Sequence, residues 1–188
     1  MTKSYIVSLL SALPVLIWIS CSSSDSNVKN TKIATQKTEM TKAAAREPRL
    51  PAVARYWVQD SEGTRHQLSE WIGKQPVVIN FWGTWCGPCR MEIPGLIRLY
   101  DEYKGRGVEI LSLALRDQPV QVNQFAERAG MNWVMLLANE NVVRAFGYPR
   151  AVPTTIFLDK KGREVSRHTG ARPYEVFKPE FEAIASGS

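Results

Sequence analysis

Residues 80–90 read Asn-Phe-Trp-Gly-Thr-Trp-Cys-Gly-Pro-Cys-Arg, and this stretch decides the fold. The β-branched run Val77–Ile79 before it is typical of a buried parallel strand. Beyond it, apolar residues recur at i, i+3, i+4 and i+7, the spacing of one helix face: Ile93, Leu96, Ile97 and Tyr100. Cys86 and Cys89 are therefore predicted to lie at a strand-to-helix junction.

This position gives the two cysteines a specific chemistry. Cys86 falls at the helix N-terminus, where unpaired backbone N–H groups and the helix dipole lower the pKa of a thiol. Cys89 lies one turn later on the same face, close enough for a disulfide. Gly87 is expected to let the turn close tightly, and Pro88 suits the first helical turn. The pattern predicts dithiol–disulfide exchange with Cys86 as the nucleophile and Cys89 as the resolving thiol.

The segment Trp85–Cys89 resembles the active site of the thioredoxin superfamily, and the wider string from Asn80 to Pro94 resembles its membrane-tethered TlpA/ResA-like branch. The similarity continues at intervals to about Gly170. A bare C-x-x-C is weak, but this one has the expected strand–helix context. The resemblance implies an α/β protein with a thioredoxin-like fold, in which helices flank a central mixed β-sheet, with an N-terminal hairpin and an inserted helix.

The same resemblance assigns residues around the cysteines. It implies that Trp85 is a partly exposed cap on the nucleophile and that Trp82 is structural. It also implies a cis peptide bond before Pro153, which would turn the Val152 backbone toward the sulfurs and let a client chain pair there as an added strand. The loop 147–151 before this proline is one residue longer than usual, borders the active site and is a candidate for setting partner choice.

Asn80 is a departure from thioredoxin itself, which has a buried Asp at this place. An asparagine does not titrate, so another group must assist proton transfer at Cys89. Glu92, one turn beyond Cys89, is the nearest acid in the sequence. Its place on the helix nevertheless favours an exposed carboxylate, and both interpretations stay open.

Short patterns predict the remaining elements. A turn signal at Asp60–Gly63 indicates a hairpin, and Ser69 is a candidate N-cap for a short helical turn. Apolar spacing over 122–129, closed by Gly130, predicts a helix that plain thioredoxins lack and the TlpA/ResA-like branch carries as its insertion. The final helical segment is expected to break at Pro179. A buried strand is expected at 108–115, further strands at 133–137 and 152–158, a helix at about 140–146 and an edge hairpin at 163–168.

Residues 1–21 resemble an export signal. The apolar run Tyr5–Ile19 has 15 residues, short of the roughly 20 that span a bilayer and typical of a signal-peptide core. Cys21 at the polar boundary resembles the lipidated cysteine of a bacterial lipoprotein, although Trp18 stands where such signals usually have Leu. An uncleaved N-terminal anchor and ordinary cleavage nearby are the alternatives, and all three place the domain outside the cytoplasm.

Composition separates a tether from a folded domain. Residues 22–50 are rich in Ser, Thr, Lys and Ala and have too few large apolar groups for a core, so we expect a flexible tether. Residues 51–188 are expected to form the thioredoxin-like domain. The chain carries a net charge of +6, but only +2 of it falls within this domain. No basic stripe for nucleic acid is therefore expected.

Other chemistries fit the cysteines less well. A c-type haem site needs His after the second Cys, where Arg90 stands, and zinc needs two more ligands. His66 and His168 fall in turn or edge contexts and are expected to be solvated, which also disfavours copper delivery. Peroxiredoxins have Thr three residues before the reactive Cys, whereas Thr84 stands two before Cys86.

The Gly-Pro dipeptide between the cysteines is the thioredoxin pairing, which belongs to a low reduction potential. We therefore expect a reductase of oxidised exported client proteins, with apocytochrome c as one client class that the resemblance suggests. Its only redox group would be the Cys86–Cys89 disulfide, with no metal or other cofactor, and its electrons would come from a membrane thiol-transferring protein. A disulfide oxidase or isomerase, and a non-enzymatic metal-binding or partner-binding module, are the alternatives.

Overall fold

The computed structural model describes residues 51–187. The expected export signal, Cys21 and the tether lie outside these residues. Within them, the chain forms seven strands, four α-helices and three short 3-10 turns. The strands are β1 (Trp57–Asp60), β2 (Arg65–Gln67), β3 (Val77–Trp82), β4 (Glu109–Ala114), β5 (Val134–Leu137), β6 (Thr154–Leu158) and β7 (Glu164–Thr169). The helices are α2 (Gly87–Tyr103), α3 (Pro119–Ala129), α4 (Glu140–Ala145) and α5 (Tyr174–Ser186).

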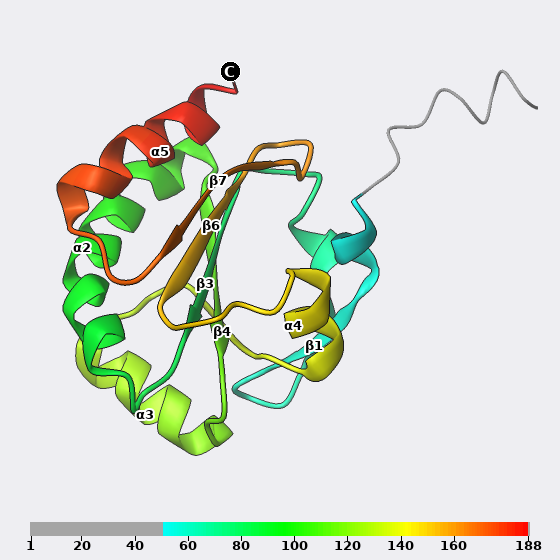
Figure 1. The fold of residues 1–188 in the computed structure, drawn as a ribbon, viewed down its shortest axis with the longest axis vertical. Helices are drawn as coiled ribbons and strands as arrows, with labels where there is room; N and C mark the ends of the chain where they lie inside the picture. Colours follow the sequence, from blue (N-terminus) through cyan, green and yellow to red (C-terminus); the bar gives the residue numbers. More distant parts are fainter. Residues whose placement is uncertain (1–50, 188) are drawn as a thin grey trace, which may run out of the picture. The chain divides into compact units, whose positions relative to one another are not determined.

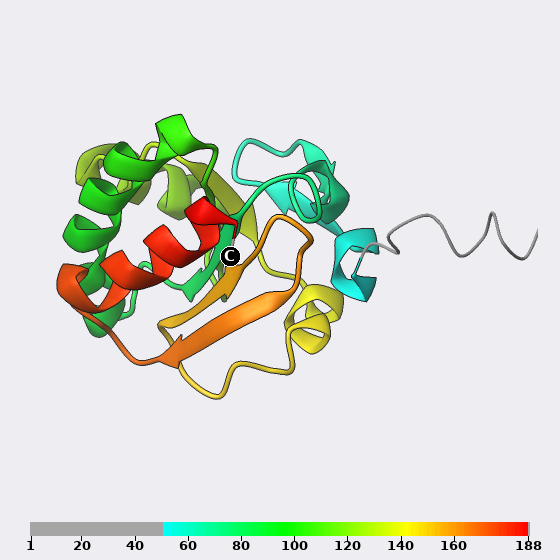
Figure 2. The ribbon, with the colours of Figure 1, turned by 90° about the horizontal axis from the view of Figure 1, so that it is seen from above.

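The strands form one mixed sheet in the order β2-β1-β5-β4-β3-β6-β7. Strands β3, β4 and β5 pair in parallel, whereas β6 pairs antiparallel with both β3 and β7, and β1 pairs antiparallel with both β5 and β2. Helices α2, α3 and α5 cover one face, and α4 lies on the other (Figures 1 and 2). The expected fold class is confirmed.

Strand β3 lies in the interior of the sheet, between β4 and β6, and all six of its residues are buried. Alternate side chains serve opposite faces, as a strand requires. Val78 and Trp82 join the core beneath α2 and α5, while Val77, Ile79 and Phe81 join the core on the α4 side. Asn80 shares its parity with Val78 and Trp82, so its side chain points toward α2.

Two expected details of the elements are wrong. The short turn Leu68–Glu70 begins after Gln67 rather than at Ser69, and Gln67 and Glu70 form a reciprocal capping box. Helix α5 continues through Pro179. The carbonyl that loses its donor there belongs to Glu175, which is exposed and open to water, while the buried face of α5 holds the helix in place: Phe177, Phe181 and Ile184.

The other sequence-based elements are confirmed. The hairpin turns at Asp60–Gly63, and helix α3 ends at Gly130, whose positive φ of 74° closes it. Strand β7 forms an edge of the sheet. Among residues 51–187, no helix has the length and hydrophobicity required for a transmembrane segment.

Candidate active site

Cys86 and Cys89 form a disulfide at the N-terminus of α2. Cys86 is the N-cap residue, and its Sγ accepts a hydrogen bond of 3.2 Å from the Cys89 backbone N–H. Pro88 lies in the first turn, where no backbone donor is missed. The sulfur of Cys86 therefore occupies the place where backbone donors and the helix dipole stabilise an anion once the disulfide is reduced.

The loop before Cys86 is fixed from the end of β4. The Asp117 carboxylate accepts hydrogen bonds from the Thr84 backbone N–H at 2.8 Å and from the Thr84 hydroxyl at 2.6 Å. The Trp85 indole N–H donates a hydrogen bond to the Leu115 carbonyl at 3.0 Å, and the Trp85 side chain is about half exposed. Trp85 is thus partly exposed, as expected, while Trp82 is fully buried.

Residues before β6 form the other side of the site. The Val152–Pro153 peptide bond is cis, and the Val152 carbonyl oxygen lies 3.7 Å from Cys86 Sγ. Pro153 is itself anchored, because its carbonyl accepts the Gly170 N–H at 2.8 Å. The Val152 backbone is thus next to the sulfur that the sequence assigns to nucleophilic attack.

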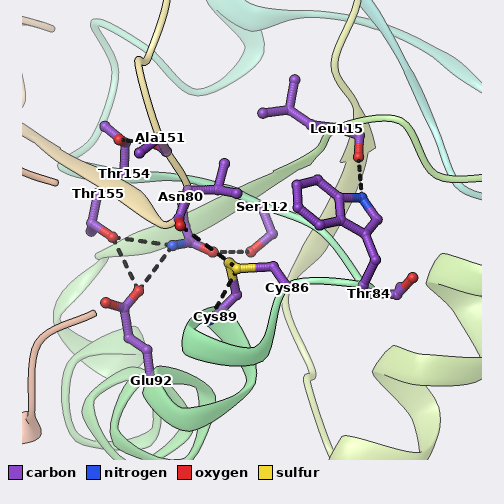
Figure 3. The surroundings of a disulfide bond; sticks show 12 residues. Asn80, Thr84, Cys86, Cys89, Glu92, Ser112, Leu115, Ala151, Thr154 and Thr155 are labelled. Carbon is purple, nitrogen blue, oxygen red and sulfur yellow. Dashed lines mark hydrogen bonds between the residues drawn. A yellow bond between two sulfur atoms is a disulfide. The ribbon is translucent and has the colours of Figure 1, made fainter. Parts of the chain in front are cut away.

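A buried polar cluster lies behind the disulfide (Figure 3). Asn80 Nδ2 donates to Glu92 Oε1 and to Thr155 Oγ1, each at 3.1 Å, and the Thr155 hydroxyl donates to the same Glu92 oxygen at 3.2 Å. The second oxygen, Glu92 Oε2, accepts the Arg172 backbone N–H at 3.0 Å. Glu92 lies one helical turn beyond Cys89 on α2, which brings this cluster close to the side chain of Cys89.

Burial raises the pKa of Glu92 to about 7, and the hydrogen bonds from Arg172, Thr155 and Asn80 offset part of this shift. A carboxyl group with a pKa near neutral exchanges a proton readily at physiological pH. Asn80 cannot do this, but it orients the carboxyl group. Its own Oδ1 accepts from the Ser112 hydroxyl at 3.4 Å.

Three expectations about site residues are wrong. Glu92 is buried, with 3% exposure, because α2 turns it toward Asn80 rather than toward solvent. Gly87 has neither a positive φ nor a close neighbour, so the tight turn does not require glycine there. His66 and His168 are not simply solvated, because each lies about 3 Å from a carboxylate: Asp60 and Glu70 for His66, and Glu180 for His168.

Sequence reasoning missed Thr155, the Arg172 backbone and the Thr84–Asp117 pair. Thr155 faces Asn80 in the β3–β6 register, and that register was the one signal that could have found it. Arg172 and Asp117 come from loops, whose course leaves no pattern in the sequence. Within residues 51–187, no group of three or more His, Cys, Asp or Glu side chains is placed to hold a metal ion.

Comparison with known proteins gives a consistent family. The AhpC/TSA family profile matches residues 49–165. The thiol-disulfide oxidoreductase ResA of Geobacillus thermodenitrificans is 38% identical over 128 residues, which cover 68% of this chain and 72% of ResA. ResA of Halalkalibacterium halodurans is 37% identical with the same coverage. A thiol:disulfide interchange protein of Chlorobium tepidum, 24% identical, shares the fold with a TM-score of 0.64 over 73% of this chain and 97% of its own.

Proposed function

This chain belongs to the AhpC/TSA family and is a ResA-like thiol-disulfide oxidoreductase, and we propose that it works as an extracytoplasmic reductase of disulfides in exported client proteins. The observation that carries the direction is the Gly87-Pro88 dipeptide in the first turn of α2, between the two cysteines. It is the thioredoxin pairing, and thioredoxin has a reduction potential of about −270 mV, far below that of the oxidant DsbA. The buried Glu92 lies one turn from Cys89 and does not stabilise a thiolate there, so it does not work against a low potential.

In the proposed cycle, the reduced protein starts the reaction. The Cys86 thiolate attacks one sulfur of a client disulfide, so that a Cys86–client disulfide forms and the other client sulfur leaves as a thiolate. Glu92 then accepts the Cys89 proton, and the Cys89 thiolate attacks Cys86 Sγ. The second client thiolate leaves, and the Cys86–Cys89 disulfide remains. Two electrons pass from the protein to the client.

The Val152 backbone is the proposed docking edge for the client. Its carbonyl lies beside Cys86 Sγ, so a client segment that pairs with this edge would bring its cysteine to the nucleophile. The half-exposed Trp85 ring flanks the same approach. Apocytochrome c before haem attachment is a client class that fits this reductive role.

The cycle requires electrons from outside the domain, and we assign their supply to a membrane protein that transfers thiol equivalents. We also propose that the N-terminus tethers the domain to the membrane, with Cys21 as the lipidated residue. The mass of the mature N-terminal peptide from the native host tests this, because a retained leader with unmodified Cys21 would favour an uncleaved anchor.

The experiment that tests the direction compares two reactions of the purified protein. We expect catalytic amounts to speed dithiothreitol-driven reduction of insulin disulfides at least about 10-fold, because the positioned thiolate replaces a free thiol. We expect no acceleration when the oxidised protein is given reduced, unfolded ribonuclease. Fast oxidation of ribonuclease with slow insulin reduction would instead establish an oxidase.

A further inference from the structure

A groove of about 490 Å³ opens beside the disulfide. Trp85 forms one wall and Val152 another, and the Val152 carbonyl lies 3.7 Å from Cys86 Sγ. The groove therefore borders the residue whose carbonyl is next to the reacting sulfur. The rest of its lining comes from the end of β4, from α4 and its approach, and from the loop before Pro153, and it includes Arg116, Glu140, Tyr148 and Arg150.

The groove carries an excess of positive charge. Arg116 and Arg150 are exposed, and neither forms an ion pair or a side-chain hydrogen bond with any residue in the range 51–187. Glu140 is the one acidic residue of the lining in that range, but it is already engaged. Glu140 Oε1 accepts a hydrogen bond of 2.7 Å from the Tyr148 hydroxyl and lies 3.7 Å from Arg144 Nη2. Within the described part of the chain, two guanidinium groups are thus left without a carboxylate.

The backbone holds both arginines in defined places. Arg116 lies between Leu115, whose carbonyl binds the Trp85 indole, and Asp117, whose carboxylate is engaged by Thr84. Its φ of 56° is in the left-handed region, which few residues other than glycine adopt, so its neighbours impose this conformation.

Arg150 comes two residues after Tyr148, which also has a left-handed backbone conformation. Tyr148 has a φ of 51°, and its hydroxyl also accepts a hydrogen bond of 2.9 Å from Arg144. A rigid frame reduces the entropy lost when a ligand binds to the charges it carries.

We propose that this groove selects client polypeptides with an acidic residue a few positions from the cysteine that Cys86 attacks. The inference rests on the proposed function and specifies its clients. The planar guanidinium group pairs with a carboxylate through two parallel hydrogen bonds, which suits Arg116 and Arg150 to Asp or Glu. The half-exposed rings of Trp85 and Tyr148 supply the aromatic contacts that accompany arginine at binding hot spots.

The test measures kcat/KM for short peptides with an internal disulfide that carry three Glu, three Gln or three Lys beside one cysteine. We expect the wild type to prefer Glu over Lys by about 2- to 30-fold at low salt, the range for two exposed ion pairs. The preference should shrink toward 1 in about 0.5 M salt. In the double variant Arg116→Glu/Arg150→Glu, the preference should reverse.

Comparing variants on the same peptides removes the effect of the peptide charges on the peptide thiols. Arg128→Glu is the matched control, because Arg128 is exposed on α3 and does not line the groove. A preference that is unchanged in the double variant, or that changes equally in Arg128→Glu, would overturn the inference.

Neutral 2-hydroxyethyl disulfide separates this inference from the proposed function. We expect the wild type and the Arg128→Glu control to reduce it at equal rates, and the melting temperature of the oxidised double variant shows that this variant folds. A wild type that reduces it but ignores peptide charge would overturn the client selection alone. A wild type that cannot reduce it would overturn the proposed reductase, and the client selection with it.

Discussion

Cys86→Ser is expected to lower thiol–disulfide exchange to the uncatalysed rate, whereas Cys89→Ser is expected to accumulate a stable disulfide between Cys86 and the client. The two sulfurs differ in their surroundings. Cys86 Sγ lies beside the Val152 carbonyl and the groove, whereas Cys89 lies one turn from the buried Glu92. Without Cys89, the first exchange still occurs, but no thiolate is present to release the client.

Non-reducing electrophoresis followed by mass spectrometry of the linked peptides measures this result. Both variants should be made in a Cys21→Ser background, so that no other thiol of the chain reacts. The background protein itself should retain full exchange. Client trapping through Cys89 in the Cys86→Ser variant, with none through Cys86 in the converse variant, would reverse the assigned roles.

Glu92→Gln is expected to change both the stability and the rate of the resolving step. In the folded, oxidised protein the pKa of Glu92 is raised to about 7, above its ordinary value of 4.5. The folded state therefore binds this proton more tightly than the unfolded state, and the contribution to stability is lost as pH rises from about 4.5 through 7. The stabilisation lost across this pH range is about 3 kcal/mol, because a pKa difference of one unit between the folded and unfolded states corresponds to 1.36 kcal/mol.

Glutamine carries no such proton, so the variant should lack this fall in the free energy of unfolding between pH 5 and pH 8. Urea denaturation of both oxidised proteins across this range measures the difference. Glu109→Gln is the control, because burial also raises the pKa of Glu109. The Glu109 carboxylate accepts a hydrogen bond from the Tyr100 hydroxyl and is not part of the cluster near Cys89. It should leave the exchange chemistry unchanged.

The same substitution should slow release of the client by about 100-fold near pH 7, the usual size of a lost general base. In the wild type, the rate of the resolving step should rise through a transition near pH 7, and in Glu92→Gln this transition should disappear. Rapid-quench measurement of the mixed disulfide gives this rate. If the transition near pH 7 in the rate of the resolving step persists in Glu92→Gln, another group accepts the Cys89 proton.

Local patterns in the sequence were sufficient for the redox centre. The strand Val77–Ile79, the helix face that follows and the two cysteines between them specify their geometry within one short segment. Helix α3 could also be predicted, because its apolar spacing and its terminal Gly130 act locally. In such segments, the periodicity of side chains and the end signals decide the structure.

The surroundings of that centre depend on contacts that no local pattern encodes. The sequence alone favours an exposed position for Glu92. In the structure, the β3–β6 register places Thr155 opposite Asn80, and the loop before α5 brings the Arg172 N–H to the Glu92 carboxylate. Pro179 reads as a helix break, because sequence alone does not show which face of α5 is packed. Tertiary packing decides both cases.

The reduction potential of the Cys86–Cys89 couple tests the proposed reductase most directly. It should be measured on the chain with Cys21→Ser, equilibrated in dithiothreitol redox buffers at pH 7, with the fraction of free thiol read by mass after alkylation. We predict a value near that of thioredoxin, at about −270 mV, because Gly87-Pro88 is the thioredoxin dipeptide and Glu92 does not favour the Cys89 thiolate. A value above about −150 mV, close to the oxidant DsbA at about −120 mV, would contradict the proposed direction of electron flow.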